Sequence, residues 1–233
     1  GLLMAVIAWA TTYSRLCRHF SRSGLFGRGA MEKFFSVNRD IFLRTLCLIS
    51  VMLFFTSAGS RQGETVLAVN ALLMQFYMMF SYIMDGFAYA GEAISGKRYG
   101  AGNHKALRET VSALFRWGAG MTLGFTLAYA LGGEAFVSLL TSDRSVILAS
   151  QEYLFWAVLM PMAGVAAFVW DGVFIGCTMT GGMLRSMFGA TIAFFGVYFV
   201  ARSSMGNHGL WLAFTLYMAM RGAIQTIIWG RRR

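Results

Sequence analysis

The sequence alternates long apolar runs with short segments that are polar, basic or rich in glycine. A helix crosses a bilayer in about 20 residues, and six runs reach that length at residues 41–58, 64–94, 111–131, 146–176, 183–201 and 210–228. A shorter apolar run opens the chain. The pattern predicts an all-α polytopic membrane protein: a six-helix transmembrane bundle plus the end of a preceding helix.

The breaks between these runs predict the domain organisation. We expect residues 1–14 to be the end of a preceding transmembrane helix and residues 15–40 to be a basic linker. The six-helix lobe then covers residues 41–230, and residues 231–233 form a basic tail. Because the chain opens inside an apolar run without an initiator methionine, we interpret it as the C-terminal part of a longer protein.

Composition supports the membrane assignment and decides what the positive charge means. Hydrophobic residues make up 57% of the chain, charged residues only 13%, and the formal net charge is +10. Such a charge could indicate nucleic-acid binding, but the basic residues lie between the apolar runs instead of along one face. We therefore expect the lipid bilayer, and no nucleic acid, as a partner.

The positions of Lys and Arg predict the orientation of the bundle. If the spans alternate, only three of the 20 basic residues fall on the outer side: Arg61, Arg144 and Arg202. Sixteen fall on the inner side: Arg15, Arg18, Arg22, Arg28, Lys33, Arg39, Arg44, Lys97, Arg98, Lys105, Arg108, Arg116, Arg185, Arg231, Arg232 and Arg233. Cytoplasmic loops carry such an excess, so the linker and the C-terminus are predicted to be cytoplasmic and the protein to lie in the plasma membrane.

Three acidic residues inside the spans are the first candidates for chemistry. Asp85 and Glu92 lie seven positions apart, which places both carboxylates on one helix face, about 10 Å from each other. Asp171 lies on another span. Acids are costly at membrane depth unless they face protein or water, so they are typical of an ion or substrate path. Each could instead form a structural pair, and Lys97 is such a partner for Glu92.

Other polar residues inside the spans give weaker candidates. Asn70, Gln75 and Tyr89 could line the same cavity, although such groups often only hydrogen-bond across helices. The scattered cysteines and loop histidines have no metal-ligand spacing. We therefore expect no cofactor and no metal site, apart from a possible Na⁺ at Asp171.

Local motifs add three expectations about the helices. Gly120 and Gly124 form a pair of small residues suited to close helix contact, and either Asp143 or Ser142 could cap the helix that follows. The dipeptide Asp-Gly occurs at both Asp85 and Asp171, which hints at repeated helices.

Three blocks carry a resemblance to a known family: DGFAYAGEAISGKRYGAGN at 85–103, LLTSDRSVILASQEYLFW at 139–156 and WDGVFIGCTMTGGMLRSM at 170–187. In their order and spacing they resemble the C-terminal lobe of multidrug and toxic compound extrusion (MATE) antiporters, in the branch named for damage-inducible protein F. The resemblance implies a twelve-helix fold of two lobes around a cavity that opens alternately to each side. It also implies that Asp171, on the tenth helix, belongs to a cation site. Members with that site use a second acid on the seventh helix, whereas residues 41–58 contain none.

The leading hypothesis is a secondary active transporter that expels organic, cationic xenobiotics by antiport with H⁺ or Na⁺. Its partners would be small organic cations and the missing N-terminal lobe of the same chain. A lipid-linked oligosaccharide flippase is the alternative within transport, but it would need a cationic cavity, and Arg221 is the one clearly buried cation. A membrane-embedded enzyme is a further alternative. It is disfavoured because no histidine lies in a span and no G-x-S-x-G motif occurs.

Overall fold

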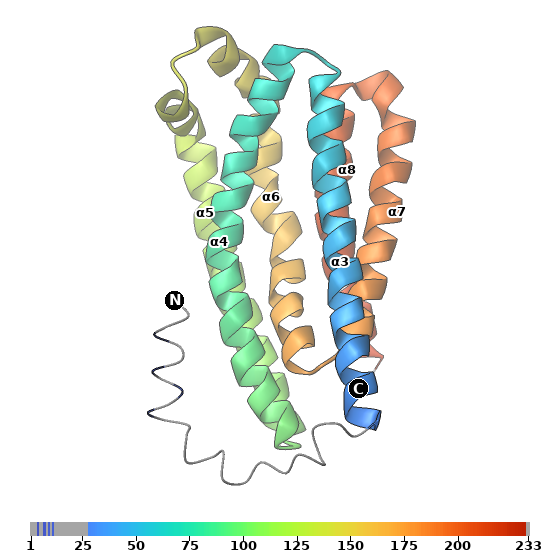
Figure 1. Ribbon diagram of the computed structural model, residues 1–233. Coiled ribbons are helices and arrows are strands. Elements are labelled where there is room, and N and C mark those ends of the chain that lie inside the picture. Colours follow the sequence, from blue (N-terminus) through green and yellow to red (C-terminus); the bar gives the residue numbers. More distant parts are fainter. Residues whose placement is uncertain (1–3, 5–6, 8, 10, 12–27, 232–233) are drawn as a thin grey trace. The chain divides into compact units, whose positions relative to one another are not determined.

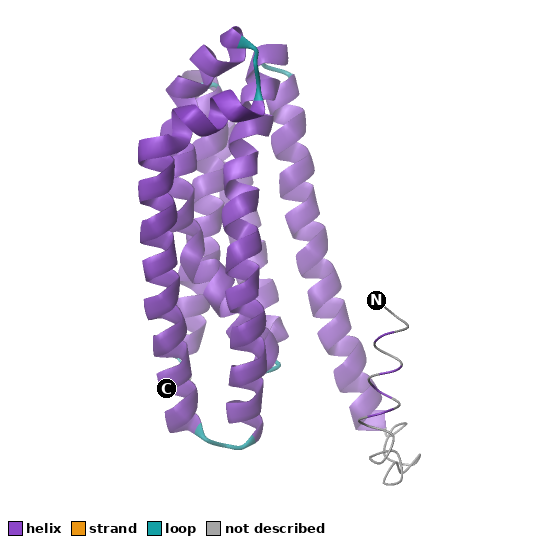
Figure 2. Cartoon of the chain, turned by 90° about the vertical axis from the view of Figure 1, so that its left-hand side faces the viewer, coloured by secondary structure: helices purple, strands orange, loops and turns teal. Residues whose placement is uncertain are grey.

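Helices make up nearly all of the computed structural model, which describes residues 28–231 together with residues 4, 7, 9 and 11 (Figure 1). In residues 28–231 the helices are α3 (Arg28–Ser60), α4 (Glu64–Gly100), α5 (His104–Leu140), α6 (Arg144–Gly176), α7 (Thr180–Met205) and α8 (Asn207–Gly230). This range contains no β-strand, and short loops connect the helices (Figure 2). The expected helix end at 1–14, most of the linker and the last two arginines of the tail lie outside the described residues.

The chain divides into two compact units, Gly1–Arg39 and Asp40–Arg233. In the first unit, the described part of α3 exposes Phe34 and Phe35, whose rings meet edge to face at 5.7 Å. The second unit contains the rest of α3 and the other five helices, and it holds every candidate site residue.

Five of the six helices are long and apolar enough to cross a membrane, namely α3 to α7. At 24 residues α8 is also long enough, since 1.5 Å per residue gives about 36 Å. Arg221 and Gln225 lower its hydropathy. The prediction of an all-α membrane bundle is confirmed.

Within the second unit, α6 is the central helix and contacts α4, α5, α7 and α8. It is also the most buried span, with 61% of its apolar window inside the unit. Aromatic side chains join α3 to the outer helices: Phe54 packs edge to face against Phe194 and Phe195 of α7, and Phe55 packs against Trp211 of α8. Residues on α6 are therefore held within reach of several helices.

Several helices extend further than the apolar runs predicted. α4 continues to Gly100 instead of ending near residue 94, and α3 already begins at Arg28, inside the predicted linker. Only Gly206 separates α7 from α8, where we expected a turn over residues 202–209. Its φ of 51° is a conformation that glycine adopts readily. Hydropathy marks the part of a helix that lies in hydrocarbon, whereas Lys and Arg continue a helix beyond it.

Gly120 and Gly124 do not make the close helix contact that their spacing predicted. A Cβ added to either would meet nothing within 4 Å in the structure. The close contact lies between α4 and α6 instead, where a Cβ on Gly172 would lie 2.1 Å from the backbone oxygen of Ala88. A Cβ on Gly176 would lie 2.4 Å from the backbone oxygen of Glu92. The two backbones cross directly at these glycines.

Asp143 is the N-cap of α6, as predicted. Its Oδ1 accepts hydrogen bonds from the backbone N–H of Ser145 at 2.8 Å and of Val146 at 3.4 Å, and from the Ser145 hydroxyl at 2.7 Å. These donors stabilise the carboxylate and hold the pKa of Asp143 below its usual range, with the Ser145 hydroxyl as the largest cause.

Replacing Asp143 with alanine should fray the first turn of α6, because the cap then loses its acceptor. Since the folded pKa is lowered, the cap stabilises the helix above the unfolded pKa, and this stability is lost as the pH falls through the folded pKa. Hydrogen exchange at residues 145–147 measures both effects as protection factors. Asp143→Ser should keep the protection of these amides, because serine also caps helices. That protection should no longer fall at acidic pH, because serine has no carboxyl group. Equal protection in wild type and Asp143→Ala would show that the cap is unimportant.

Candidate functional site: a buried cluster around Asp171

The side chain of Asp171 is the centre of a buried polar cluster that joins three helices. Asp171 is 6% exposed on the central helix α6. Its Oδ2 accepts hydrogen bonds from Arg221 of α8 at 2.6 Å and from Arg44 of α3, and its Oδ1 accepts one from Gln225 at 2.8 Å. Arg221 and Gln225 lie four residues apart and therefore share one face of α8. This face meets Asp171 because α6 and α8 pack together.

The cluster carries one more positive than negative charge, counting Asp171 against Arg44 and Arg221. The side chain of Arg221 is only 3% exposed, whereas that of Arg44 is 19% exposed. Among the described residues, Arg44 Nε and Gln225 Oε1 are buried without a hydrogen-bond partner. Arg44 is thus both the more accessible and the less completely bonded of the two arginines.

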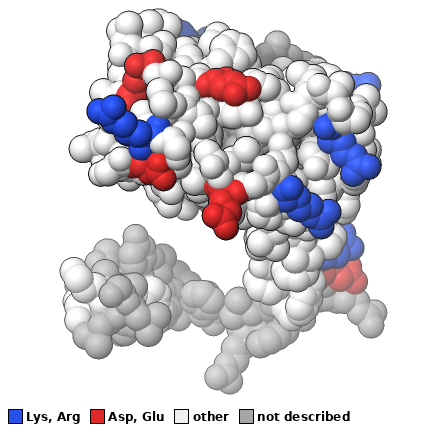
Figure 3. All heavy atoms as spheres, turned by 90° about the horizontal axis from the view of Figure 1, so that it is seen from above, with Lys and Arg blue, Asp and Glu red and all other residues white. Residues whose placement is uncertain are grey.

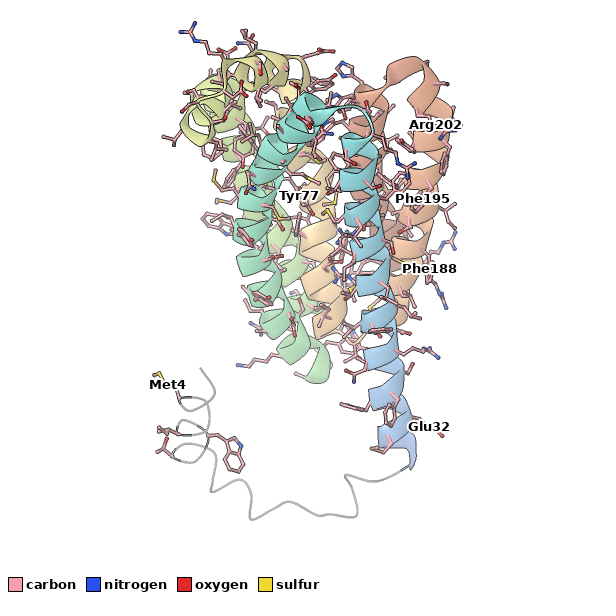
Figure 4. The ribbon with its side chains drawn as sticks, turned by 45° about the horizontal axis from the view of Figure 1, so that its top comes forward. Met4, Glu32, Tyr77, Phe188, Phe195 and Arg202 are labelled. Atoms are coloured by element: carbon pink, nitrogen blue, oxygen red, sulfur yellow. The ribbon has the colours of Figure 1, made fainter. Side chains whose placement is uncertain are left out.

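Asp85 lies within electrostatic range of this cluster. The half-buried carboxyl group on α4 interacts electrostatically with Asp171, Arg44 and Arg221. Asp85, Asp171 and Arg221 also act on Tyr77, which is 5% exposed on α4 (Figure 4). With Asp85 included, two carboxylates and two guanidinium groups interact electrostatically in this region. The sequence-predicted pair of Asp85 and Asp171 is therefore brought into one region.

Three other predicted site residues are not among the hydrogen-bond partners of Asp171 in the described part of the chain. Tyr89 is 71% exposed, Gln75 is exposed, and Glu92 is half-buried beside the α4–α6 backbone crossing. Four cavities of about 160 to 520 Å³ are lined by described residues, and none of the four has Asp85 or Asp171 in its wall. Whether these side chains line a transport cavity stays a prediction.

Asn70 sits in a second buried cluster that connects α4 to α8. It exchanges two hydrogen bonds with Asn207, both 2.9 Å long, and its Oδ1 also accepts one from Trp211 Nε1 at 2.8 Å. Only 2% of Asn70 is exposed. This arrangement matches the packing alternative that the sequence left open for it.

Sequence reasoning missed three polar residues in or near the site. Arg44 was counted among inner basic residues, although it reaches Asp171, and Gln225 was not considered. Asp40 is 6% exposed and accepts a hydrogen bond from the Thr180 hydroxyl at 3.2 Å. It lies on α3 one residue before the predicted span. The helix that includes the acid-free span at residues 41–58 therefore does carry a buried acid, just before that span. Asp40 and Arg44 are four residues apart and therefore share one helix face. This pair of opposite charges at the start of a span is a sequence signal that could have identified both residues.

These features define a class: a polytopic helical membrane protein with charged groups buried among its spans. A sequence profile of the MatE family matches residues 41–201, and the chain belongs to this family. The resemblance inferred from the three sequence blocks is therefore confirmed.

Relatives and solved structures agree with this assignment. The chain is 39% identical over 204 residues to DNA damage-inducible protein F of Escherichia coli (strain K12), a match covering 88% of the chain and 44% of the relative. It is 29% identical over 187 residues to Protein DETOXIFICATION 42 of Arabidopsis thaliana, covering 79% and 36%. The chain thus spans less than half the length of these relatives.

Two crystal structures of MATE proteins share the fold. One, in the bent conformation, superposes with a TM-score of 0.79 at 20% identity over 97% of this chain and 51% of that one. The other, in complex with MaL6, gives a TM-score of 0.75 at 19% identity over 98% and 53%. The chain therefore has the fold of about half of a MATE protein.

Proposed function

We propose that the chain forms the C-terminal half of a secondary active transporter that expels small organic, cationic xenobiotics in exchange for H⁺ or Na⁺. An N-terminal six-helix lobe would complete the alternating-access unit. Membership of the MatE family and the match to about half of each relative support this proposal. The protein would work in the plasma membrane, with its linker and C-terminus in the cytoplasm, as the distribution of basic residues favours.

The contacts of Asp171 are the observation that carries the proposal. One carboxylate bonds to side chains from α3 and α8 while it sits on α6. Neutralising that carboxylate with a proton would weaken both ion pairs at once and free the helices to rearrange. A local change of charge that shifts the equilibrium between two helix packings is the simplest way to couple an ion to a conformational change.

The same geometry favours H⁺ over Na⁺ as the coupling ion. A proton adds directly to Asp171, whereas Na⁺ would have to displace at least one guanidinium group from the carboxylate. Arg44 is the group that would leave, because its side chain is more exposed than that of Arg221. An organic cation could then take its place beside Asp171 and Asp85.

Convergence of Arg44 and Arg221 also favours a second candidate, a flippase for a lipid-linked oligosaccharide. Two buried guanidinium groups could bind a pyrophosphate, since arginine matches phosphate geometry. Both groups already bond to Asp171, however, so a substrate pyrophosphate would have to compete with it. Antiport remains the better explanation of the cluster.

Reconstitution of the protein, with its natural flanking sequence, into proteoliposomes tests the proposal. A fluorescent organic cation should move against its gradient when a pH gradient is imposed, and a protonophore should stop this movement. The same assay with an imposed Na⁺ gradient tests whether Na⁺ is the coupling ion. Movement of a labelled lipid-linked oligosaccharide without any gradient would favour the flippase. Failure of both gradients to drive the cation would refute antiport.

A further inference from the structure

Two of the three arginines on the predicted outer side line the same pair of cavities. Arg61, in the α3–α4 turn, and Arg202, near the end of α7, both border a cavity of about 310 Å³ and a neighbouring one of about 160 Å³. Tyr198 and Ala58 also belong to both walls. The remaining lining residues are Gln62, Ser203 and Gly206 in the larger cavity, and Phe54, Ser57 and Phe199 in the smaller.

This pocket is positively charged, and no described acid offsets it. Neither cavity has an Asp or Glu in its wall, and no described carboxylate forms a salt bridge with Arg61 or Arg202. Arg202 lies over the ring of Phe199 at 5.2 Å, a cation–π contact that leaves its N–H groups available. Lys and Arg form separate patches on the end of the molecule that Figure 3 shows. Two converging arginines in a pocket therefore indicate an anionic ligand.

An apolar surface leads away from this pocket along α7. Phe188, Phe195 and Arg202 recur every seven residues and follow one another along one side of the helix (Figure 4). Phe188 is 46% exposed, and Phe199 beside the pocket is 52% exposed. Phe54 of α3 forms the other side, with its ring 5.0 Å from that of Phe195. The pocket thus joins a charged end to an apolar path along a membrane-spanning helix.

We propose that this pocket binds a phospholipid, with its phosphate between Arg61 and Arg202 and an acyl chain along Phe195 and Phe188. Arginine forms bidentate, charge-assisted hydrogen bonds with phosphate oxygens. A soluble phosphate would use the arginines alone, whereas a lipid also covers the exposed phenylalanines. Arg61 follows the C-terminal end of α3, whereas Arg44 lies in the middle of that helix. The lipid site does not depend on the proposed transport function.

Native mass spectrometry of the purified protein with dioleoylphosphatidylglycerol tests this site. Arg61→Gln and Arg202→Gln should each weaken retention of one lipid by roughly 10-fold, since each removes charge-assisted hydrogen bonds. The double variant should lose that lipid entirely. Arg144→Gln is the matched control, because it removes the third outer arginine and lies outside both cavities; it should retain the lipid. Equal melting temperatures in lipid-free detergent would show that the variants are folded.

Two further arms identify the occupant. Phe188→Ala should weaken retention of the dioleoyl lipid but leave a dihexanoyl lipid unaffected, because only the long chain reaches Phe188. Glycerol 3-phosphate, which has no acyl chain, should not displace the bound lipid at equal concentration. Displacement by glycerol 3-phosphate would overturn the lipid assignment and indicate a soluble anion. Unchanged lipid retention in the double arginine variant would overturn the site.

Discussion

Replacing Asp171 with asparagine should abolish gradient-driven extrusion and lower the free energy of unfolding by about 3 kcal/mol. The substitution leaves Arg221, which is 3% exposed, without its carboxylate among apolar residues. It also removes the partner of Arg44. Removing one partner of a buried ion pair lowers stability because the remaining charge stays desolvated. Transport in proteoliposomes and thermal unfolding in detergent measure the two effects.

A second substitution separates the coupling role of Asp171 from its packing role. Arg221→Gln, combined with Asp171→Asn, removes the more deeply buried of the two unpaired charges and should recover most of the lost stability, because the remaining Arg44 side chain is 19% exposed. Transport should stay absent, because the carboxylate that bonds to side chains of both α3 and α8 is gone. Asp85→Asn is the stability control, since this half-buried residue should cost less than about 1 kcal/mol. If the double variant transports normally, Asp171 is only a packing residue.

The long apolar helices could be predicted from the sequence because hydropathy reports which residues can lie in hydrocarbon. The same property explains the errors at the helix ends. Residues 28–40 and 95–100 are too polar to have been assigned to the spans from the sequence, yet they continue α3 and α4. Position relative to the bilayer and position within a helix are different quantities, and hydropathy measures only the first.

The site could be predicted only in part, because composition identifies a costly group but not its partners. Asp171 and Asp85 stood out as acids inside spans, and the structure brings them into one region. Arg44 did not stand out, since a basic residue near a span end is ordinary. Its contact with Asp171 joins positions 127 residues apart in the sequence, and it depends on where the fold places α3 relative to α6. Contacts of that separation leave no local sequence pattern.

The crossing of α4 and α6 gives the second large expected effect: Gly172→Ala should destabilise the bundle by about 3 kcal/mol. The added Cβ would lie 2.1 Å from the Ala88 oxygen and 2.8 Å from the Ala88 Cα. Both are backbone atoms, so the helices must separate to accommodate it. The separation would also shift Asp171, the preceding residue, relative to α8. We therefore expect a lower melting temperature and weaker transport.

Gly86 is the matched control, because it follows Asp85 just as Gly172 follows Asp171. A Cβ on Gly86 would meet nothing within 4 Å in the structure, so Gly86→Ala has no clash to relieve. It should stabilise α4 by roughly 0.5–1 kcal/mol, the usual gain for alanine over glycine inside a helix. Both variants place an alanine after an aspartate, and they differ in whether the new Cβ meets the backbone of a neighbouring helix. If both change the melting temperature equally, direct contact between the α4 and α6 backbones does not determine the stability of the bundle.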